Sequence, residues 1–152
     1  MYGQGATSLA ATLDIGQDDA KEVIKAFTTG LGGFADMKAA LIRELKTGRI
    51  RLIDGRQLQC NSDHKALNYA IQGDAAVVMK HWAMESVRRL EDTSYRLLAA
   101  VHDELQGECL PMDVAAAIRT LEQTAADVGE RLGFNVAIAA SAAHGSSWNE
   151  TH

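Results

Sequence analysis

The feature that most constrains the fold is the stretch 97–110, in which two apolar runs flank three consecutive ionisable residues. These residues are His102, Asp103 and Glu104. Apolar runs on both sides of a short polar segment are typical of a β-hairpin, here with charged groups at its turn. Adjacent carboxylates beside a buried sheet are costly unless water, a cation or a metal compensates them. Asp103 and Glu104 are therefore candidate ligands of a divalent metal, and the alternative is an ordinary polar turn.

Length and composition indicate one globular domain of ordinary size. The chain has 152 residues, 47% of them hydrophobic, which is enough for a core. No apolar run approaches the roughly 20 residues that span a bilayer, and the first residues lack a signal-peptide pattern. The two cysteines, Cys60 and Cys109, have no metal-type spacing. We therefore expect a soluble protein in a reduced, cytoplasmic setting, with no membrane partner.

Charge is distributed unevenly along the chain. The net charge of −5 argues weakly against a nucleic-acid partner. Residues 38–65, however, contain seven basic and only three acidic residues. A basic segment on an acidic chain is compatible with phosphate contacts, and it is equally compatible with a solvated charged face. The charge pattern leaves both interpretations open.

Periodicity predicts three helices followed by a hairpin in the first part of the chain. The helices are expected over 7–13, 17–28 and 34–46, with a glycine-rich break before the third. An alternating pattern follows, and Asp54-Gly55 predicts a two-residue hairpin turn between 49–53 and 56–59. Such a hairpin would expose Arg49, Arg51 and Arg56. It would either lie along a nucleic-acid backbone or be an edge hairpin protected by charge.

The second part of the chain predicts two long helices around the charged hairpin. One helix should run from Ser62 or Asp63 to about Glu91, and another from about Pro111 to Leu132. A last strand is expected over 134–140. The apolar stripe predicted for the first of these helices consists of Leu67, Ile71, Ala75, Val78, Trp82 and Leu90.

A second line of residues on the same predicted helix is polar. His64, Asn68 and Gln72 are spaced four apart, so their side chains project from one face on successive turns. Amides donate and accept hydrogen bonds without carrying charge, which suits contact with base edges or sugars. An ordinary polar helix face would show the same spacing.

Several short motifs, taken in order, resemble the C-terminal part of family A DNA polymerases, the family of bacterial polymerase I and related phage replicative enzymes. The resemblance covers essentially all 152 residues. Each motif is short, and their common order and spacing strengthen the resemblance. The matching segments are Tyr2-Gly3 followed by Leu9-Ala10 and Leu13, then Asp54-Gly55-Arg56, Asn68 to Ala76, Val101 to Glu104, and Gly145 to His152.

The resemblance implies roles for the residues at the predicted hairpin tip. Asp103 would bind the catalytic magnesium ions, and Glu104 would be the neighbouring acidic group that supports or binds the metal. His102 would contact the primer terminus. Nucleotidyl transfer by two magnesium ions is the activity that such a site implies.

The resemblance also implies contacts with DNA outside the tip. Asn68 and Gln72 would contact the minor groove of the primer-template duplex, where acceptor positions are nearly independent of sequence. His64 occupies a position that other members use for the same contact. Arg56 would touch the DNA backbone, and Tyr2 would lie beside the nascent base pair.

The chain also departs from the family pattern. The second metal-binding aspartate of the family lies on a palm strand upstream of anything in this sequence. The fingers-helix arginine and lysine that hold the dNTP phosphates, and the thumb, are likewise missing. Asp74 stands where many members carry a smaller neutral residue. The chain would thus supply one of the two carboxylate-bearing strands that two-metal phosphoryl transfer requires.

These observations predict an α+β fold, with helices followed by an antiparallel palm-like sheet on two long helices, as an incomplete polymerase palm. Residues 1–48 would end the fingers and 49–152 would form the C-terminal part of the palm. The expected function is that of a fragment or split subunit of a DNA-directed DNA polymerase, inactive alone. Its partners would be DNA primer-template, dNTP and a polypeptide carrying the missing aspartate, fingers helix and thumb.

Two alternatives belong to other classes of protein. The chain would otherwise be a non-catalytic nucleic-acid-binding or scaffolding domain that retains the palm fold. A stand-alone metal hydrolase is a weaker alternative, because the sequence lacks a second carboxylate cluster. The absence of the upstream strand further predicts an exposed sheet edge and self-association.

Overall fold

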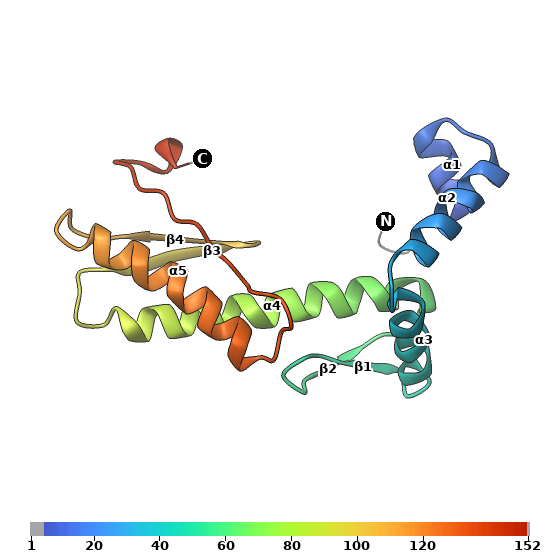
Figure 1. Cartoon of the computed structure of the whole chain (residues 1–152). Helices are drawn as coiled ribbons and strands as arrows, with labels where there is room; N and C mark the ends of the chain where they lie inside the picture. The colour runs from blue at the N-terminus through green and yellow to red at the C-terminus, as the bar shows by residue number, and fades with distance from the viewer. Residues whose placement is uncertain (1–4, 152) are drawn as a thin grey trace. The chain divides into compact units, whose positions relative to one another are not determined.

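The computed structural model describes residues 5–151, which divide into two compact units (Figure 1). The first unit extends to Asp74 and the second begins at Ala75, so the division falls inside helix α4 (Asp63–Arg89). Each unit contains helices and one two-stranded antiparallel sheet, which confirms the predicted α+β class. The boundary predicted between fingers and palm at 48 and 49 is a functional division and stays a prediction. In the part of the chain described, no helix is both long and apolar enough to cross a membrane.

The first unit begins with a pair of short helices, α1 (Ala6–Leu13) and α2 (Gln17–Gly30). Asp14 ends α1 in the left-handed conformation, with φ of 54°, and turns the chain into α2. The apolar faces of the two helices meet in a small core. Its buried residues are Leu9, Ala10 and Ala20, with Ala6, Ile15 and Ile24 packed against them.

A second core in this unit joins helix α3 (Phe34–Leu45) to strands β1 (Arg49–Arg51) and β2 (Gln57–Gln59). Gly48 adopts φ of 74° between helix and strand, a conformation that costs glycine little. The first turns of α4 close the core, whose buried residues are Leu45, Ile50, Cys60 and Ala66. This core holds the hairpin against two helices and leaves its other face to solvent.

The turn of the β1–β2 hairpin is longer than the sequence predicts. Leu52 N–H donates to the Arg56 carbonyl (2.7 Å) and Gly55 N–H donates to the Leu52 carbonyl (2.8 Å). The loop is thus three residues, with Gly55 at φ of 87° in the left-handed position, where the sequence suggested a two-residue turn. Asp74 accepts a hydrogen bond from the Ile53 N–H (2.8 Å), which ties the loop to α4. That tie gives a structural role to the aspartate that departs from the family pattern.

Helix α4 has the predicted length, but its predicted apolar stripe is only partly correct. Leu67 and Leu90 are buried as expected. Ile71 and Ala75 are exposed, whereas Ala66 and Val77 are buried. The buried face therefore shifts along the helix, because the two units pack different elements against it. A single apolar stripe predicted at helical periodicity for the whole of α4 does not show this shift.

The second unit contains the C-terminal half of α4, strands β3 (Arg96–Val101) and β4 (Glu104–Glu108), and helix α5 (Val114–Arg131). The strands pair in antiparallel register with Val101 opposite Glu104, and a bulge lies between Leu97 and Ala99. Helix α5 lies alongside α4, and the Trp82 indole N–H donates to the Leu121 carbonyl (2.9 Å). Its buried residues are Ala117, Thr124, Ala125, Val128 and Gly129.

The strand predicted over 134–140 is absent, and this prediction is wrong. The segment is irregular, and a short 3-10 helix (Trp148–Glu150) follows near the end of the described chain. Ile138 instead packs on α5, where a Cβ placed on Gly129 would lie 2.7 Å from its Cγ1. A strand needs a neighbour for its backbone hydrogen bonds, and the β3–β4 sheet of the described residues does not extend to this segment.

Candidate metal and nucleic-acid site

The β3–β4 hairpin presents the predicted acidic tip on a strained turn. His102 and Asp103 are the two loop residues between the paired positions Val101 and Glu104. His102 has φ of 53°, which is uncommon for a residue other than glycine and is a feature of tight hairpin turns. Such strain costs roughly 1–3 kcal/mol and tends to occur at functional sites. The sequence prediction of a hairpin with charged groups at its turn is confirmed.

The two carboxylates of the tip have different surroundings. Asp103 is exposed, while Glu104 is half-buried and accepts a hydrogen bond from the Gln106 amide (3.2 Å). Carboxylate oxygens are the ligands that magnesium prefers, so the donor set fits that ion. Residues 5–151 contain no group of three or more potential metal ligands. Within the described residues, the tip thus supplies part of a metal site.

The hairpin is clasped at the end opposite the tip. Asp113 accepts hydrogen bonds from both the Ser94 N–H (2.9 Å) and the Ser94 hydroxyl (2.5 Å). The Ser94 hydroxyl oxygen in turn accepts from the Leu110 N–H (2.8 Å). The two hydrogen bonds that Ser94 donates lower the pKa of Asp113. The clasp fixes where β3 begins and where the chain leaves β4, and therefore helps to position the tip.

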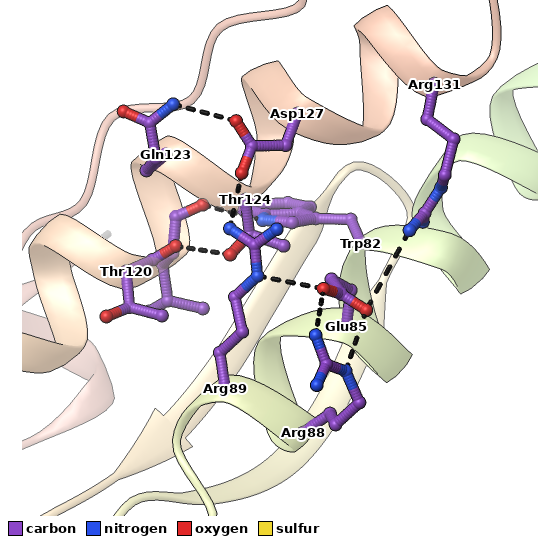
Figure 2. A network of polar contacts seen from close by, with 10 residues as sticks. Trp82, Glu85, Arg88, Arg89, Thr120, Gln123, Thr124, Asp127 and Arg131 are labelled. Carbon is purple, nitrogen blue, oxygen red and sulfur yellow. Dashed lines mark hydrogen bonds and ion pairs between the residues drawn. The ribbon is translucent and has the colours of Figure 1, made fainter.

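A polar network that was not predicted from the sequence joins α4 to α5 within the second unit (Figure 2). Glu85 binds Arg88 (2.7 Å) and Arg89 (2.9 Å), and Arg89 also binds Asp127 on α5 (2.5 Å). Hydrogen bonds from Arg88 and Arg89 lower the pKa of Glu85 to about 2. The spacing of three and four residues along α4 is a signal for the first two contacts. No sequence signal indicates the contact with Asp127, 38 residues away.

The predicted polar line lies in the first unit, on the first turns of α4. His64 and Gln72 are exposed and Asn68 is half-buried. The side chains of these three residues form no hydrogen bond with any other residue between 5 and 151, so their polar tips are available to a ligand. The structure confirms that they follow one helix face. Their proposed contact with the minor groove stays a prediction.

The remaining predicted contacts are Arg56 and Tyr2. The Arg56 guanidinium forms an ion pair with Asp54, with Nε 2.6 Å from Oδ2, inside the turn of the β1–β2 hairpin. Contact between Arg56 and DNA would have to compete with that ion pair. Tyr2 lies outside the described residues. Arg56 and the polar line thus belong to the first unit, and the acidic tip belongs to the second.

The fold is that of a polymerase domain. The structure resembles the POL domain of Pol1 from M. smegmatis, solved in complex with DNA primer-template and dNTP, with a TM-score of 0.77. The match covers 84% of this chain and 25% of that chain, at 24% sequence identity. At this identity the likeness establishes the fold, an incomplete palm-like α+β arrangement.

The chain belongs to DNA polymerase family A, whose family model matches residues 1–150. Its relatives include the DNA-directed DNA polymerase of Enterobacteria phage T3, which is 24% identical over the whole of this chain. DNA polymerase I of Mycobacterium leprae is 29% identical over 97% of the chain. The chain spans 25% of the length of the phage protein and 18% of the mycobacterial one.

Proposed function

We propose that the chain contributes one metal-binding carboxylate strand and a set of minor-groove contacts to a template-directed DNA polymerase. The observation that carries the proposal is the exposed acidic tip on a strained two-residue turn, in a chain that matches the family model over 1–150. In the reaction, the primer 3′-hydroxyl oxygen attacks the α-phosphorus of a dNTP. A phosphodiester bond forms and pyrophosphate leaves.

Each residue of the tip has a distinct role in this proposal. Asp103 holds magnesium directly, and Glu104 supports or completes that coordination. Magnesium, when bound, neutralises the charge that develops on the reacting phosphate and orients the attacking and leaving oxygens. His102 contacts the primer terminus, and its strained backbone fixes where its side chain leaves the turn.

The contacts on the first unit position the nucleic acid. The amides of Asn68 and Gln72, together with His64, hydrogen-bond to minor-groove acceptors of the primer-template duplex. Arg56 touches the backbone after exchanging its ion pair with Asp54, and Tyr2 lies beside the nascent base pair. Contacts of this kind accept any sequence and are sensitive to the shape of a mispair.

The second metal-binding aspartate, the fingers helix and the thumb would come from polypeptide outside these 152 residues, either a partner chain or the remainder of a longer one. Two-metal phosphoryl transfer requires both carboxylate-bearing strands. The isolated chain should therefore not extend a primer, and extension by the purified chain would contradict this part of the proposal.

The two-stranded β3–β4 sheet of the described residues has open edges, and Leu98 beside them is 63% exposed. Size-exclusion chromatography of the chain alone should detect self-association through such edges.

The decisive variant is Asp103→Asn, which keeps the shape of the side chain and removes its charge. In the assembled enzyme we expect single-nucleotide incorporation to fall at least about a hundredfold, or roughly 2.7 kcal/mol in the barrier. Duplex binding should stay within about twofold, since the tip is not the main phosphate contact. The matched control is Glu108→Gln at the exposed far end of β4, which should leave incorporation unchanged. Normal incorporation by Asp103→Asn would reject the catalytic role.

A measurement on the isolated chain tests metal binding separately. Manganese, a paramagnetic substitute for magnesium, should broaden the NMR amide signals of His102 to Leu105 in the wild-type chain. Asp103→Asn should remove the broadening, whereas Glu108→Gln should retain it. No broadening in the wild type would favour the second candidate, a non-catalytic nucleic-acid-binding domain.

A further inference from the structure

The outer face of the β1–β2 hairpin is polar and basic on both strands. Ile50 is fully buried, so its neighbours Arg49 and Arg51 both project from the opposite face. Their register partners are Gln59 and Gln57. Two guanidinium groups and two amides therefore share one exposed face. The two arginines lie about 7 Å apart along the strand.

This face borders an open hollow of about 350 Å³ next to the end of α3. Its lining residues are Glu44, Thr47, Arg49, Arg51 and Gln57. An Arg49 Nη donates to the Gln57 amide oxygen (3.0 Å), which leaves its other N–H groups for a ligand. Glu44 accepts mainly from the Arg51 backbone N–H (3.1 Å), and its ion pair with the Arg51 guanidinium is long at 3.9 Å. Both arginines can therefore bind an anion at the hollow.

We propose that this hairpin face and hollow form a further DNA-contact surface, which binds the phosphodiester backbone without regard to sequence. Charge complementarity identifies the occupant, because residues 38–65 carry seven basic and three acidic side chains on a chain of net charge −5. Arginine forks fit phosphate oxygens, and glutamine amides hydrogen-bond to phosphate and sugar. The surface does not depend on Arg56, whose guanidinium is held by Asp54. The inference goes beyond the proposed function and shares with it only that DNA is the ligand.

The test is binding of fluorescein-labelled, mixed-sequence oligonucleotides to the full chain, followed by anisotropy over a range of NaCl concentrations. Arg49→Gln combined with Arg51→Gln removes two phosphate contacts. The slope of log K against log salt should fall by about 1.4 on a single strand or about 1.8 on a duplex. The two DNA forms are measured separately, so the larger loss identifies the form that the surface prefers.

A second variant is expected to change DNA affinity in the opposite direction. Glu44→Gln keeps an oxygen that accepts from the Arg51 N–H and removes the one acidic side chain of the hollow. It should tighten binding of the same oligonucleotides, by about threefold or more at low salt. The matched control is Lys25→Gln combined with Arg119→Gln, which removes two exposed charges outside the hairpin.

Each outcome is decisive. An unchanged salt slope in the Arg49 and Arg51 variant, or an equal fall in the Lys25 and Arg119 control, would overturn the proposal. Weaker binding by Glu44→Gln would also overturn it. All of these substitutions are at accessible side chains, and circular dichroism should show unchanged melting. Failure of the Asp103→Asn experiment would leave this result standing, because the salt slope does not measure catalysis.

Discussion

The two hairpins of this chain have the same simple topology and opposite chemical character. The β1–β2 hairpin carries arginine and glutamine on its outer face and turns through Gly55. The β3–β4 hairpin carries carboxylates at its tip and turns through His102, at a φ that disfavours side chains. A relaxed turn accompanies the surface proposed to hold the DNA backbone, and a strained turn accompanies the proposed metal site. The antiparallel hairpin alone therefore does not determine whether it binds metal or DNA. The residues of its turn and of its exposed face determine this.

The hairpins also differ in which side chains a Cβ added at a neighbouring glycine would meet. A Cβ on Gly107 of β4 would lie 2.5 Å from the Tyr95 ring, which is half-buried and rigid. A Cβ on Gly73 of α4 would lie 2.6 Å from the Leu52 Cδ2 and 2.9 Å from the Leu58 Cδ1. Both atoms are ends of aliphatic side chains of the β1–β2 hairpin, and Leu52 is buried. The first contact can be relieved only by moving an aromatic ring.

This difference predicts the largest stability effect. Gly107→Ala should destabilise the second unit by about 1–3 kcal/mol, because the ring must leave its packed position. Gly73→Ala is the matched control. It should destabilise the first unit less than Gly107→Ala does the second, because the ends of Leu52 and Leu58 can rotate and the gain in helix propensity of about 1 kcal/mol offsets part of the packing cost.

Tryptophan fluorescence during urea unfolding measures the first effect, because both tryptophans, Trp82 and Trp148, lie in the second unit. Far-UV circular dichroism follows the helices of both units. Equal destabilisation by the two alanine substitutions would show that the hairpins tolerate side chains alike.

Substitutions in the two hairpin turns should have smaller effects on stability, and the two effects should be opposite in sign. Gly55→Ala places a side chain at φ of 87° and should cost about 1–2 kcal/mol. His102→Gly should relieve strain and stabilise the chain by up to about 1 kcal/mol, although it should impair primer extension in the assembled enzyme. Chemical denaturation of the two variants gives the comparison. Destabilisation by His102→Gly would mean that the histidine side chain, and not only its backbone, supports the turn.

The smallest effect concerns pH and the polar network beside the second hairpin. The pKa of Glu85 is about 2 in the folded chain, below its ordinary value of 4.5. Its ion pairs therefore contribute stability at pH values above its unfolded pKa, and this contribution disappears as the pH falls from about 5 towards 2. Glu85→Gln should lower the melting temperature near pH 6 and flatten its decrease in acid. The control Glu130→Gln, at an exposed position on α5, should follow the wild-type curve.

Most elements of the fold could be predicted from local sequence signals. The helix bounds agree with the prediction to within about three residues. The first hairpin was expected from alternation and turn residues, and the second from two apolar runs around a charged segment. Helix spacing likewise placed His64, Asn68 and Gln72 on one face, and the apolar runs placed Asp103 at a tip. Such signals act over a few residues, where backbone geometry and side-chain periodicity suffice.

Tertiary structure decided the features that depend on distant partners. The segment 134–140 has the composition of a strand, yet it packs Ile138 on Gly129, because no neighbour supplies a ladder within the described chain. The three-residue turn at Gly55 is tied by Asp74, some 20 residues away. Local residue order thus determined where helices, hairpins and the acidic tip form. Their partners in space determined which faces are buried, because burial and hydrogen bonding depend on neighbours that periodicity cannot identify.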